Sequence, residues 1–579
     1  MTAYDKHPRV IISQSASGYD AGWNEVVSTI RANRLDGKRI ICIECYPGTF
    51  ETEIEQALLT AFSPAEIFLT RECLKTAAEL DSIIGRELTG DPVFGRLSSL
   101  DVADFFDESA LARLRAAINA AGTAIVLGTG AALAISAPDL LVYADLARWE
   151  IQQRQRRGEI GNLASNNRDA SPGEKYKRAF FVDWRVADRL KKELLPSIDF
   201  LLDSNRPSKP KMISGARFRE ALAAVTSRPF RVEPFFDPGP WGGQWMRKVC
   251  DLPEGPPNYA WCFDCVPEEN SLLLGFGNCT VEVPAIDLVF SQPQRLLGEA
   301  VHARFGTEFP IRFDFLDTME GGNLSLQVHP LTEYSAQHFG IGYTQDESYY
   351  MLDSGEDACV YLGLRENVDR AAMVRNLHAA QSGGDPFPAD DFVNRWPAKK
   401  HDHFLIPAGT IHCSGRDSMV LEISATPYIF TFKLWDWGRL GLDGRPRPIH
   451  LDRGIRNIQW DRTTSWVEKE LINRFETTAR GEGWTEERTG LHEREFIETR
   501  RHWFTGTVPH DTNGGVNVLN LVEGNEIVVE SPSDAFEPYV VHYAETFIVP
   551  AAVGRYTIRP LSPTSKQFAT IKAFVRTRA

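Results

Sequence analysis

Two histidines, a glutamate and a glutamine in the second half of the chain could together bind a metal ion. Gln327 and His329 lie in the stretch GGNLSLQVHP, where polar and apolar residues alternate with a period of two. That pattern is typical of a strand, so both side chains leave one face and their donor atoms can converge. Glu347 stands just before an apolar strand, and His412 follows a Pro-Ala-Gly turn in IPAGTIHCSG. Two imidazoles, a carboxylate and an amide oxygen suit a divalent ion such as zinc, one per chain, with a position left for water or substrate.

Two other groups of residues compete as metal ligands. His401 and His403 in KKHDHFL form an H-x-H pair on one predicted strand face, but no acidic residue follows at a suitable spacing, and we expect this charged section to lie at an exposed edge. Cys262 and Cys265 form a C-x-x-C. We interpret these two cysteines first as buried thiols. A lone histidine in a β core is more often structural than a ligand, so the four-residue pattern carries the metal prediction.

The elements that must position the four ligands are short strands. From about residue 216 onward, aromatic and β-branched runs are punctuated by Gly and Pro, which predicts an antiparallel β-barrel or sandwich. A helical interruption lies near NVDRAAMVRNLHAA. A second β section begins near Arg500, and its segment TFIVPAAVGRYTI repeats the pattern of HFLIPAGTIHCSG without a histidine at the place of His412. The sequence therefore predicts a repeated β-barrel unit, of which only the first copy holds a metal.

The first part of the chain has a different texture. KRIICIECY is a continuous apolar run, as expected of a buried parallel strand, and helical periodicity follows it. The alternation of strand and helix predicts an α/β domain over residues 1–210, and the proline- and serine-rich stretch from Asp203 to Gly215 is interpreted as a linker. We then expect a metal-binding β domain over residues 216–480 and a metal-free β domain over residues 481–579.

The loop after the first apolar run stands where a phosphate-binding loop would be. IECYPGTFETE lacks the G-x-x-x-x-G-K-[ST] pattern, so no lysine is placed to reach nucleotide phosphates. VYADLARWEIQQRQRR is similar to the strand and arginine-rich helix of nucleoside-kinase-like P-loop folds, which implies a degenerate domain of that kind. Its arginines also fit a plain solvated helix face: Arg148, Arg154, Arg156 and Arg157.

Composition limits the classes of function. The net charge is −15 over 579 residues, so we expect neither a nucleic acid nor an anionic membrane as partner. The uncharged stretch from Ala117 to Pro138 contains several glycines and is better explained as a soluble strand, turn and helix than as a membrane span. The beginning of the chain lacks the layout of a signal peptide, and the nine cysteines are scattered, which fits a reducing cytoplasm. The oligomeric state is not predicted.

Several motifs together resemble one enzyme family. NLSLQVHP, the glutamate before an aromatic strand, IPAGTIHCSG, DWGRLGLDGRPRPIHL and PGPWGGQWM look like segments of the class I mannose-6-phosphate isomerases, zinc enzymes of the cupin superfamily. The resemblance covers roughly Phe235 to Leu451. It implies a bicupin, a jelly-roll β-barrel fold, and places Ser325 beside the phosphate end of the substrate and Arg439 near the mouth of the active site. It also implies that the metal ligands are Gln327, His329, Glu347 and His412.

The chain departs from the family pattern at two positions. Gln345 stands where the family usually has a lysine, two residues before the ligand glutamate. Lys433 stands where the family usually has an arginine, three residues before the Asp of the DWGR motif. Lysine does not reproduce the bidentate fork of arginine, so both departures bear on how phosphate is bound and on which group carries the proton.

The resemblance implies a zinc-dependent aldose–ketose isomerase that converts mannose 6-phosphate to fructose 6-phosphate through an enediol. Glu422 and Lys433 are candidate proton carriers or charge stabilisers, with Arg439 beside them, and Ser325, Gln345 and Lys433 are candidate substrate-binding residues. Glu422 also fits a structural ion pair. Two alternatives stay open: an isomerase of an unphosphorylated sugar, and a non-catalytic metal-bound sugar sensor.

Overall fold

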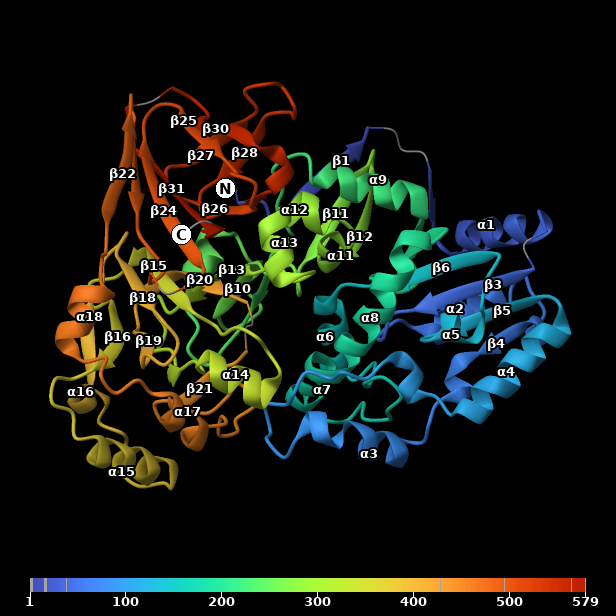
Figure 1. The fold of residues 1–579 in the computed structure, drawn as a ribbon, viewed down its shortest axis with the longest axis horizontal. Helices are drawn as coiled ribbons and strands as arrows, with labels where there is room; N and C mark the ends of the chain where they lie inside the picture. Colours follow the sequence, from blue (N-terminus) through green and yellow to red (C-terminus); the bar gives the residue numbers. More distant parts are fainter. Residues whose placement is uncertain are drawn as a thin grey trace. The chain divides into compact units, whose positions relative to one another are not determined.

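The computed structural model describes residues 4–14, 18–37, 39–426, 429–493, 495–563 and 565–577. The chain forms two compact units (Figure 1). An α/β unit comprises residues 9–225 and 268–292, and a mainly β unit comprises the other described residues. The multidomain organisation expected from the sequence is thus confirmed, while the three-domain boundaries stay a prediction.

The α/β unit is built on a seven-stranded sheet with the order β2-β8-β7-β6-β3-β5-β4. The five strands from β7 to β4 in this order run parallel, and β8 and β2 are added antiparallel. The central strands are buried over nearly their whole length, which explains their continuous apolar sequences. The strands are β2 (Tyr19–Ala21), β3 (Ile40–Cys45), β4 (Ile67–Leu69), β5 (Ala124–Gly128), β6 (Leu140–Asp145), β7 (Phe200–Asp203) and β8 (Lys211–Ser214).

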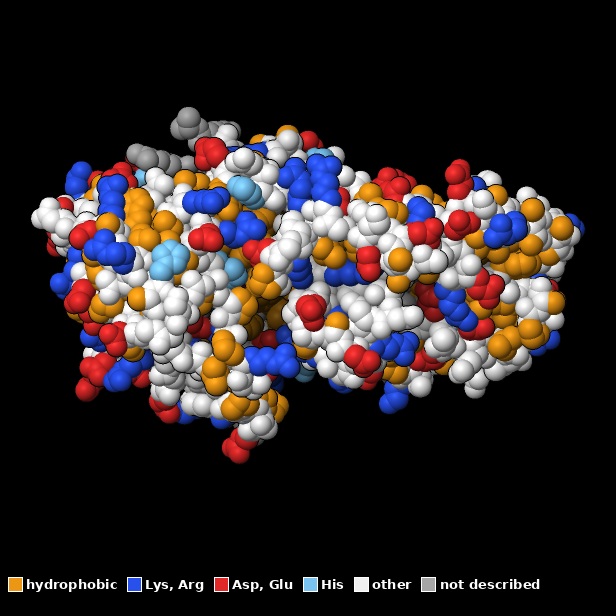
Figure 2. All heavy atoms as spheres, turned by 90° about the horizontal axis from the view of Figure 1, so that it is seen from below, with side chains coloured by type: hydrophobic (Ala, Val, Ile, Leu, Met, Phe, Trp, Pro, Cys, Tyr) orange, Lys and Arg blue, Asp and Glu red, His pale blue; other side chains and the backbone are white. Residues whose placement is uncertain are grey.

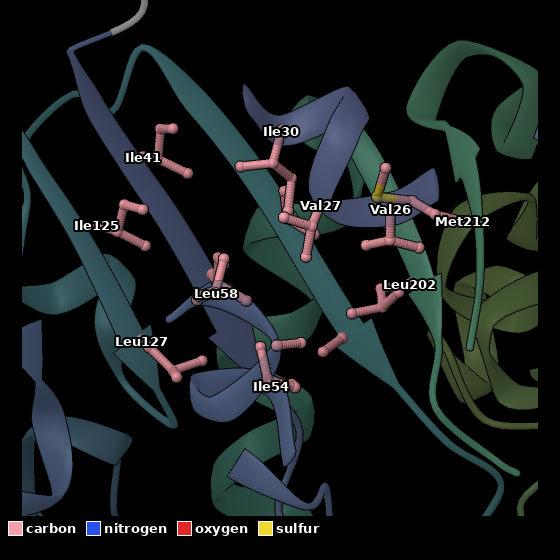
Figure 3. Close-up of a cluster of buried hydrophobic side chains, with 14 of the residues drawn as sticks. Val26, Val27, Ile30, Ile41, Ile54, Leu58, Ile125, Leu127, Leu202 and Met212 are labelled. Carbon is pink, nitrogen blue, oxygen red and sulfur yellow. The ribbon is translucent and has the colours of Figure 1, made fainter. Parts of the chain in front are cut away.

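Helices α1 (Trp23–Leu35) and α2 (Glu51–Leu58) cover one face of this sheet. Figure 3 shows Val26 and Ile30 from α1 and Leu58 from α2 pointing at side chains of the strands, among them Ile41. These residues recur at three- to four-residue spacing along each helix, so one stripe of the helix is apolar and lies on the sheet. The unit also contains α3 (Ala77–Leu88), α4 (Glu108–Ala121), α5 (Ala131–Ala134), α6 (Arg148–Arg156), α7 (Pro172–Arg178), α8 (Trp184–Leu194) and α9 (Gly215–Val225).

The stretch interpreted as a linker is part of the sheet. Asp203 ends β7, and Lys211 begins β8, which pairs with β7 in antiparallel register. The linker prediction is therefore wrong, because proline and serine mark a turn between paired strands as readily as a connection between domains.

A hairpin from later in the chain completes the α/β unit. Strands β11 (Ser271–Phe276) and β12 (Cys279–Pro284) pair with each other, and β11 pairs in parallel with β1 (Arg9–Ser13) in a three-stranded sheet. Helix α11 (Ile286–Ser291) follows, and its Asp287 lies 2.9 Å from the Lys191 ammonium of α8. The hairpin stands in the sequence between two strands of the β unit.

The β unit contains two sandwiches of eight strands each with the same topology. In the first, β13 to β20 form the sheets β18-β15-β20-β13 and β17-β16-β19-β14, which β10, β9 and β21 extend. In the second, β24 to β31 form β29-β26-β31-β24 and β25-β30-β27-β28, and β23 and β22 extend the first of these. Strand for strand the two orders correspond, so the repeat expected from the sequence is present.

The strands of the first sandwich are β9 (Phe235–Asp237), β10 (Trp261–Cys265), β13 (Ile311–Asp317), β14 (Leu326–Val328), β15 (Glu347–Ser354), β16 (Cys359–Leu364), β17 (Val393–Pro397), β18 (His403–Ile406), β19 (His412–Ser414), β20 (Ser418–Ala425) and β21 (Phe432–Trp435). Those of the second are β22 (Glu476–Gly481), β23 (Trp484–Arg488), β24 (Ile497–Phe504), β25 (Val508–Asp511), β26 (Asn517–Glu523), β27 (Glu526–Glu530), β28 (Tyr539–His542), β29 (Thr546–Val549), β30 (Arg555–Pro560) and β31 (Phe568–Val575).

Helices interrupt the first sandwich, as expected. The predicted helical insertion is α15 (Arg370–Gln381), which lies between β16 and β17. The other helices of the β unit are α10 (Trp245–Val249), α12 (Pro293–Leu297), α13 (Glu299–Phe305), α14 (Thr332–Phe339), α16 (Ala389–Phe392), α17 (Leu451–Asn457) and α18 (Thr464–Glu470).

In the described part of the chain, no helix combines the length and the apolar character needed to cross a membrane. The uncharged stretch from Ala117 to Pro138 forms the end of α4, strand β5 and helix α5. On the face drawn in Figure 2, acidic and basic side chains are interspersed rather than gathered by sign.

Candidate metal and substrate site

Strand β14 is the centre of the candidate site. Gln327 pairs with His412 of β19 on one side and with Lys433 of β21 on the other. Residues directly opposite each other on neighbouring strands project from the same face of a sheet. The three side chains therefore lie in one row, which explains why a strand in an apolar context alternates its polar residues.

The predicted metal ligands come together. His329 Nε2 lies 3.1 Å from Glu347 Oε2, and His412 Nε2 lies 2.8 Å from Glu347 Oε1. The three ligand atoms are within 4.8 Å of one another, and all three residues are buried. The amide of Gln327 is 3.2 Å from His412 Nε2, and rotation of the amide plane brings its oxygen to that place.

The hydrogen bonds of the two histidines fix which ring nitrogen carries the proton. His329 Nδ1 donates to the Phe430 carbonyl at 3.1 Å, and His412 Nδ1 donates to the Thr410 carbonyl at 2.9 Å. A carbonyl oxygen accepts and cannot donate, so in the neutral rings the lone pairs are on both Nε2 atoms. These lone pairs face the oxygens of Glu347. Such an arrangement needs a positive species between the groups, so the residues fit a divalent cation.

Charge in the cluster follows from its burial and its pairing. Burial raises the pKa of Glu347, but the two imidazoles oppose it and the pKa ends well below its ordinary value. Burial lowers the pKa of His329, but Glu347 outweighs it and the pKa is raised. The carboxylate is therefore ionised, as a metal ligand must be.

Glu422 lies on β20 beside the cluster. It pairs with Asp314 of β13 and Tyr349 of β15. Its Oε1 accepts from the Arg312 guanidinium and, at 3.1 Å, from the Ser424 hydroxyl. Burial and the neighbouring Glu347 raise the pKa of Glu422 to about 7, against the opposing effect of Arg312. The structural ion pair expected as an alternative is present, and it occupies one of the two carboxylate oxygens.

Gln345 bridges the two carboxylates. Its Nε2 donates to Glu347 Oε2 at 3.0 Å and lies 3.4 Å from Glu422 Oε1. A lysine at this position would place its ammonium between the same two acidic groups.

A cluster of cations lies at the other end of the same sheet face. Ser325 precedes Gln327 by two residues and donates to Asp436 Oδ1 at 2.9 Å. Arg447 donates to Asp436 Oδ2 at 2.7 Å, and Arg439 Nε donates to Asp436 Oδ1 at 2.9 Å. Burial, with Arg447 and Arg439 nearby, lowers the pKa of Lys433 to about 7. The Asp436 carboxylate thus lies near three basic side chains, those of Lys433, Arg439 and Arg447, so these four residues together have an excess of positive charge. We call Ser325, Lys433, Arg439 and Arg447 the cation cluster.

Sequence reasoning missed two parts of the site. Arg447 lies 3.2 Å from the Ser325 hydroxyl, and its signal was its place in the same motif as Arg439. Arg312 lies behind Glu422 on β13, 3.1 Å from Asp314. Nothing in the sequence indicates the ion pair between Arg312 and Glu422, because it forms only when β13 pairs with β20.

The competing ligand sets are not brought together in this way. His401 Nδ1 lies 2.9 Å from the Tyr350 hydroxyl, and its Nε2 lies 3.1 Å from Glu523. His403 is fully buried in β18, so the expectation of an exposed position is wrong for this residue. Strand β18 pairs with β15 on one side, and the backbone N–H of His403 donates to the Asn473 side chain. Cys262 and Cys265 are both buried, as interpreted from the sequence.

The arginine-rich helix of the α/β unit is only partly solvated. Arg156 and Arg157 are exposed, but Arg148 and Arg154 are buried. Arg154 donates to the Gly48 carbonyl at 2.9 Å and lies 4.0 Å from the centre of the Phe50 ring. The solvated-face interpretation is therefore wrong for two of the four arginines, because Arg154 holds the loop that follows β3 and Arg148 pairs with Asp188 of α8.

A pocket of about 460 Å³ lies beside that loop. Its lining includes Gly48, Glu51 and Thr129. Glu51 Oε1 accepts from the Thr129 backbone N–H at 3.0 Å, so a carboxylate already occupies a donor that could face a phosphate. Burial raises the pKa of Glu51, against the opposing effects of its hydrogen bond with Thr129 and of the nearby Arg71.

We expect the full chain to phosphorylate neither sugars nor nucleosides with ATP. No lysine extends from the loop at Gly48, and Glu51 would repel a γ-phosphate. Release of ADP should equal that of a Gly48→Val variant, whose added side chain would meet Ile151. ADP release that is lost in Gly48→Val but kept in His329→Ala would contradict the expectation and assign turnover to the α/β unit.

The fold and the site define a multidomain protein whose β part is cupin-like and carries a buried His-Glu-His cluster able to hold a metal ion. The chain is 27% identical over 218 residues to the mannose-6-phosphate isomerase of Streptococcus mutans serotype c (strain ATCC 700610 / UA159), which covers 37% of this chain and 63% of that protein. It is 25% identical over 241 residues to the mannose-6-phosphate isomerase ManA of Bacillus subtilis (strain 168), which covers 41% of this chain and 69% of that protein. The resemblance read from the motifs is thereby confirmed.

A solved structure and a family model also match parts of the chain. The crystal structure of the mannose 6-phosphate isomerase from Bacillus subtilis matches with a TM-score of 0.49 and 18% identity, over 60% of this chain and 99% of that one. Residues 22–227 match a family model described as a domain of unknown function, DUF8485.

Proposed function

We propose that the chain is a metal-dependent aldose–ketose isomerase that converts mannose 6-phosphate to fructose 6-phosphate. The observation that carries this proposal is that Gln327 of β14 lies between the two groups: His412 of the His-Glu-His cluster is on one side of it, and Lys433 of the cation cluster is on the other. We propose in addition that the β unit is a bicupin and that the α/β unit is a degenerate P-loop-kinase-like domain. The loop after β3, at the carboxyl edge of a parallel sheet, supports the latter assignment.

The proposed ligands of the ion are Gln327, His329, Glu347 and His412. Zinc in this set would act as a Lewis acid on the sugar oxygens at C1 and C2 and lower the cost of negative charge there. The two histidines and the glutamate match a His2Glu set, which is known from catalytic zinc sites, and Gln327 would add an amide oxygen.

The protein's own residues account for proton transfer and substrate orientation. Glu422 is the candidate base that moves a proton between C1 and C2, because its raised pKa makes both protonation states accessible near neutral pH. The cation cluster would bind the phosphate. Ser325 lies two residues from Gln327, roughly 6.6 Å along the strand. A sugar phosphate can therefore reach both the proposed metal ligands and the cation cluster.

The direct test is a turnover screen with metal-loaded protein against mannose 6-phosphate, other aldose phosphates and free mannose. We expect turnover of mannose 6-phosphate that a chelator abolishes and zinc restores. Turnover of free mannose alone would replace the phosphosugar assignment with a free-sugar isomerase.

The second candidate function is a metal-bound sugar sensor. It is favoured by Gln345, which stands where the family usually has a lysine. Gln345→Lys would place an ammonium between Glu347 and Glu422, so the new charge would be paired. For a catalyst that uses mannose 6-phosphate poorly, we expect kcat/KM to improve by about 1 to 2 kcal/mol, the scale of one charge-assisted hydrogen bond. Gln345→Met is the matched control and should not improve it. Metal-bound wild type and Gln345→Lys proteins that both turn over no sugar would favour the sensor.

A further inference from the structure

The register of the two sandwiches relates their residues one to one. Glu347 is the first residue of β15 and pairs with the last residue of β18 and with Ser424 of β20. Asn517 is the first residue of β26 and pairs with the last residue of β29 and with Phe574 of β31. Asn517 therefore occupies in the second sandwich the place of Glu347 in the first.

The same correspondence extends across the site. Tyr556 pairs with His510 as His412 pairs with Gln327. The Tyr556 hydroxyl donates to Asn517 Oδ1 at 2.9 Å, which repeats the contact of 2.8 Å between His412 and Glu347. The second sandwich thus keeps the geometry of the ligand set but changes its chemistry, because a phenol and an amide replace an imidazole and a carboxylate.

Lys572 occupies the place of Glu422. It lies two residues before Phe574 on β31, as Glu422 lies two residues before Ser424 on β20. The strands next to them also correspond. Glu422 pairs with Asp314 of β13, and Lys572 pairs with Arg500 of β24, which has the place of β13 in the second sandwich. An ammonium group stands in the second sandwich where the first has its candidate base.

A pocket of about 530 Å³ opens at this position. Its lining includes Thr512, Asn517, Lys572 and Phe574, together with Arg488, Glu493, Glu498, Arg500, Asp511 and Arg576. These ionisable side chains comprise four bases and three acids, so the pocket has one positive charge in excess.

Lys572 contributes to that excess. It is 6% exposed, its ammonium lies 5.6 Å from the centre of the Phe574 ring, and among the described residues it has no hydrogen-bond or ion-pair partner. The neighbouring Arg500 is already paired, at 2.7 Å with Glu486 and at 2.6 Å with Glu498. A largely buried ammonium without an anionic partner is destabilising, so its presence points to a ligand that supplies the missing negative charge.

We propose that the second sandwich is a separate binding site for a small anion that carries hydroxyl groups, such as a sugar phosphate, with its anionic group on Lys572. The Asn517 amide nitrogen can donate to a ligand hydroxyl, because its Oδ1 already accepts from Tyr556. The Thr512 hydroxyl donates to the Ala551 carbonyl at 3.0 Å and can accept from a ligand hydroxyl, and Phe574 forms an apolar wall. The site needs no metal, because the equivalents of the ligand set include one imidazole and no carboxylate.

The affinity should depend on pH through Lys572. Burial lowers its pKa to about 8, with Glu486 opposing and Arg500 contributing. The anion needs the protonated amine, so affinity should fall as pH rises through 8, by about tenfold between pH 7 and pH 9. The other ionisable groups facing Lys572 are Glu486, Glu498, Arg500, His502, His510 and Asp511.

The experiment is calorimetric titration of the full chain with glucitol 6-phosphate, which has no carbonyl to isomerise, and with inorganic phosphate. We expect two equivalents of glucitol 6-phosphate bound by the wild type and one by Lys572→Met. Lys469→Met removes an exposed lysine and should keep two. A single equivalent in the wild type that Lys572→Met retains, or no binding at all, would overturn the proposal.

Thermal melting guards against misfolding as the cause of lost binding. Lys572→Met should raise the Tm of the free protein, since it removes an unpaired buried charge, and should abolish the part of the ligand-induced increase that the second site contributes. Lys572→Arg retains the charge and should retain that increase. A lower Tm in Lys572→Met, with the ligand-induced increase intact, would contradict both the unpaired ammonium and the site.

Discussion

Replacing His329 or His412 by alanine is expected to remove the bound metal and abolish isomerisation. Each imidazole would contribute one of two nitrogen ligands, because both Nε2 lone pairs face the oxygens of Glu347. Wild-type protein should carry about one ion per chain after dialysis, and either variant close to none. Metal content by mass spectrometry and turnover of mannose 6-phosphate measure the two losses.

The matched control is another buried histidine of the same sandwich. His403→Ala removes an imidazole from β18 that does not contact Glu347, and His401→Ala removes the other half of the competing pair. Both should keep the ion. Loss of metal in these two variants, with metal retained in His329→Ala and His412→Ala, would show that the ligand assignment is wrong.

The second large effect concerns the phosphate end. Arg447→Gln should raise KM for mannose 6-phosphate by about 10- to 100-fold, because a hydrogen bond to a charged group contributes about 1.5 to 3 kcal/mol. The value of kcat should also fall, since binding energy from the phosphate helps to position the reacting carbons. Steady-state kinetics measures both parameters.

Arg445 provides the control for Arg447. It lies two residues away and is exposed, so Arg445→Gln should leave KM unchanged. Lys433→Met should behave like Arg447→Gln toward a phosphorylated substrate and should hardly affect a free sugar. An unchanged KM for mannose 6-phosphate in both Arg447→Gln and Lys433→Met would place the phosphate elsewhere.

Much of the metal site could be predicted from the sequence because its signals are local. The period-two alternation around Gln327 and His329 identifies a strand face, and the turn before His412 identifies a strand start. Their convergence with Glu347 did not follow from spacing alone, since it depends on pairing between β14, β15 and β19 in two different sheets. The family resemblance supplied that step.

The remainder depends on contacts between segments distant in sequence. Nothing around Ser271 or Cys279 indicates that their strands join β1, and apolar runs predict strands without naming their partners. Arg154 looks like any arginine of a solvated helix until the loop at Gly48 packs against it. The equivalence of Lys572 and Glu422 appears only once the register of β20 and β31 is known.

The hairpin that completes the α/β unit has a consequence for synthesis on the ribosome. β1 emerges first, yet its parallel partner β11 emerges after the whole seven-stranded sheet and after β10 of the other unit. Until then β1 is a strand with unpaired edges, which is a form prone to association with other chains. The nascent chain must therefore begin its second unit before it can finish its first. A gene fragment that stops at residue 225 encodes the seven-stranded sheet but leaves β1 without its partner, so we expect such a fragment to be poorly soluble.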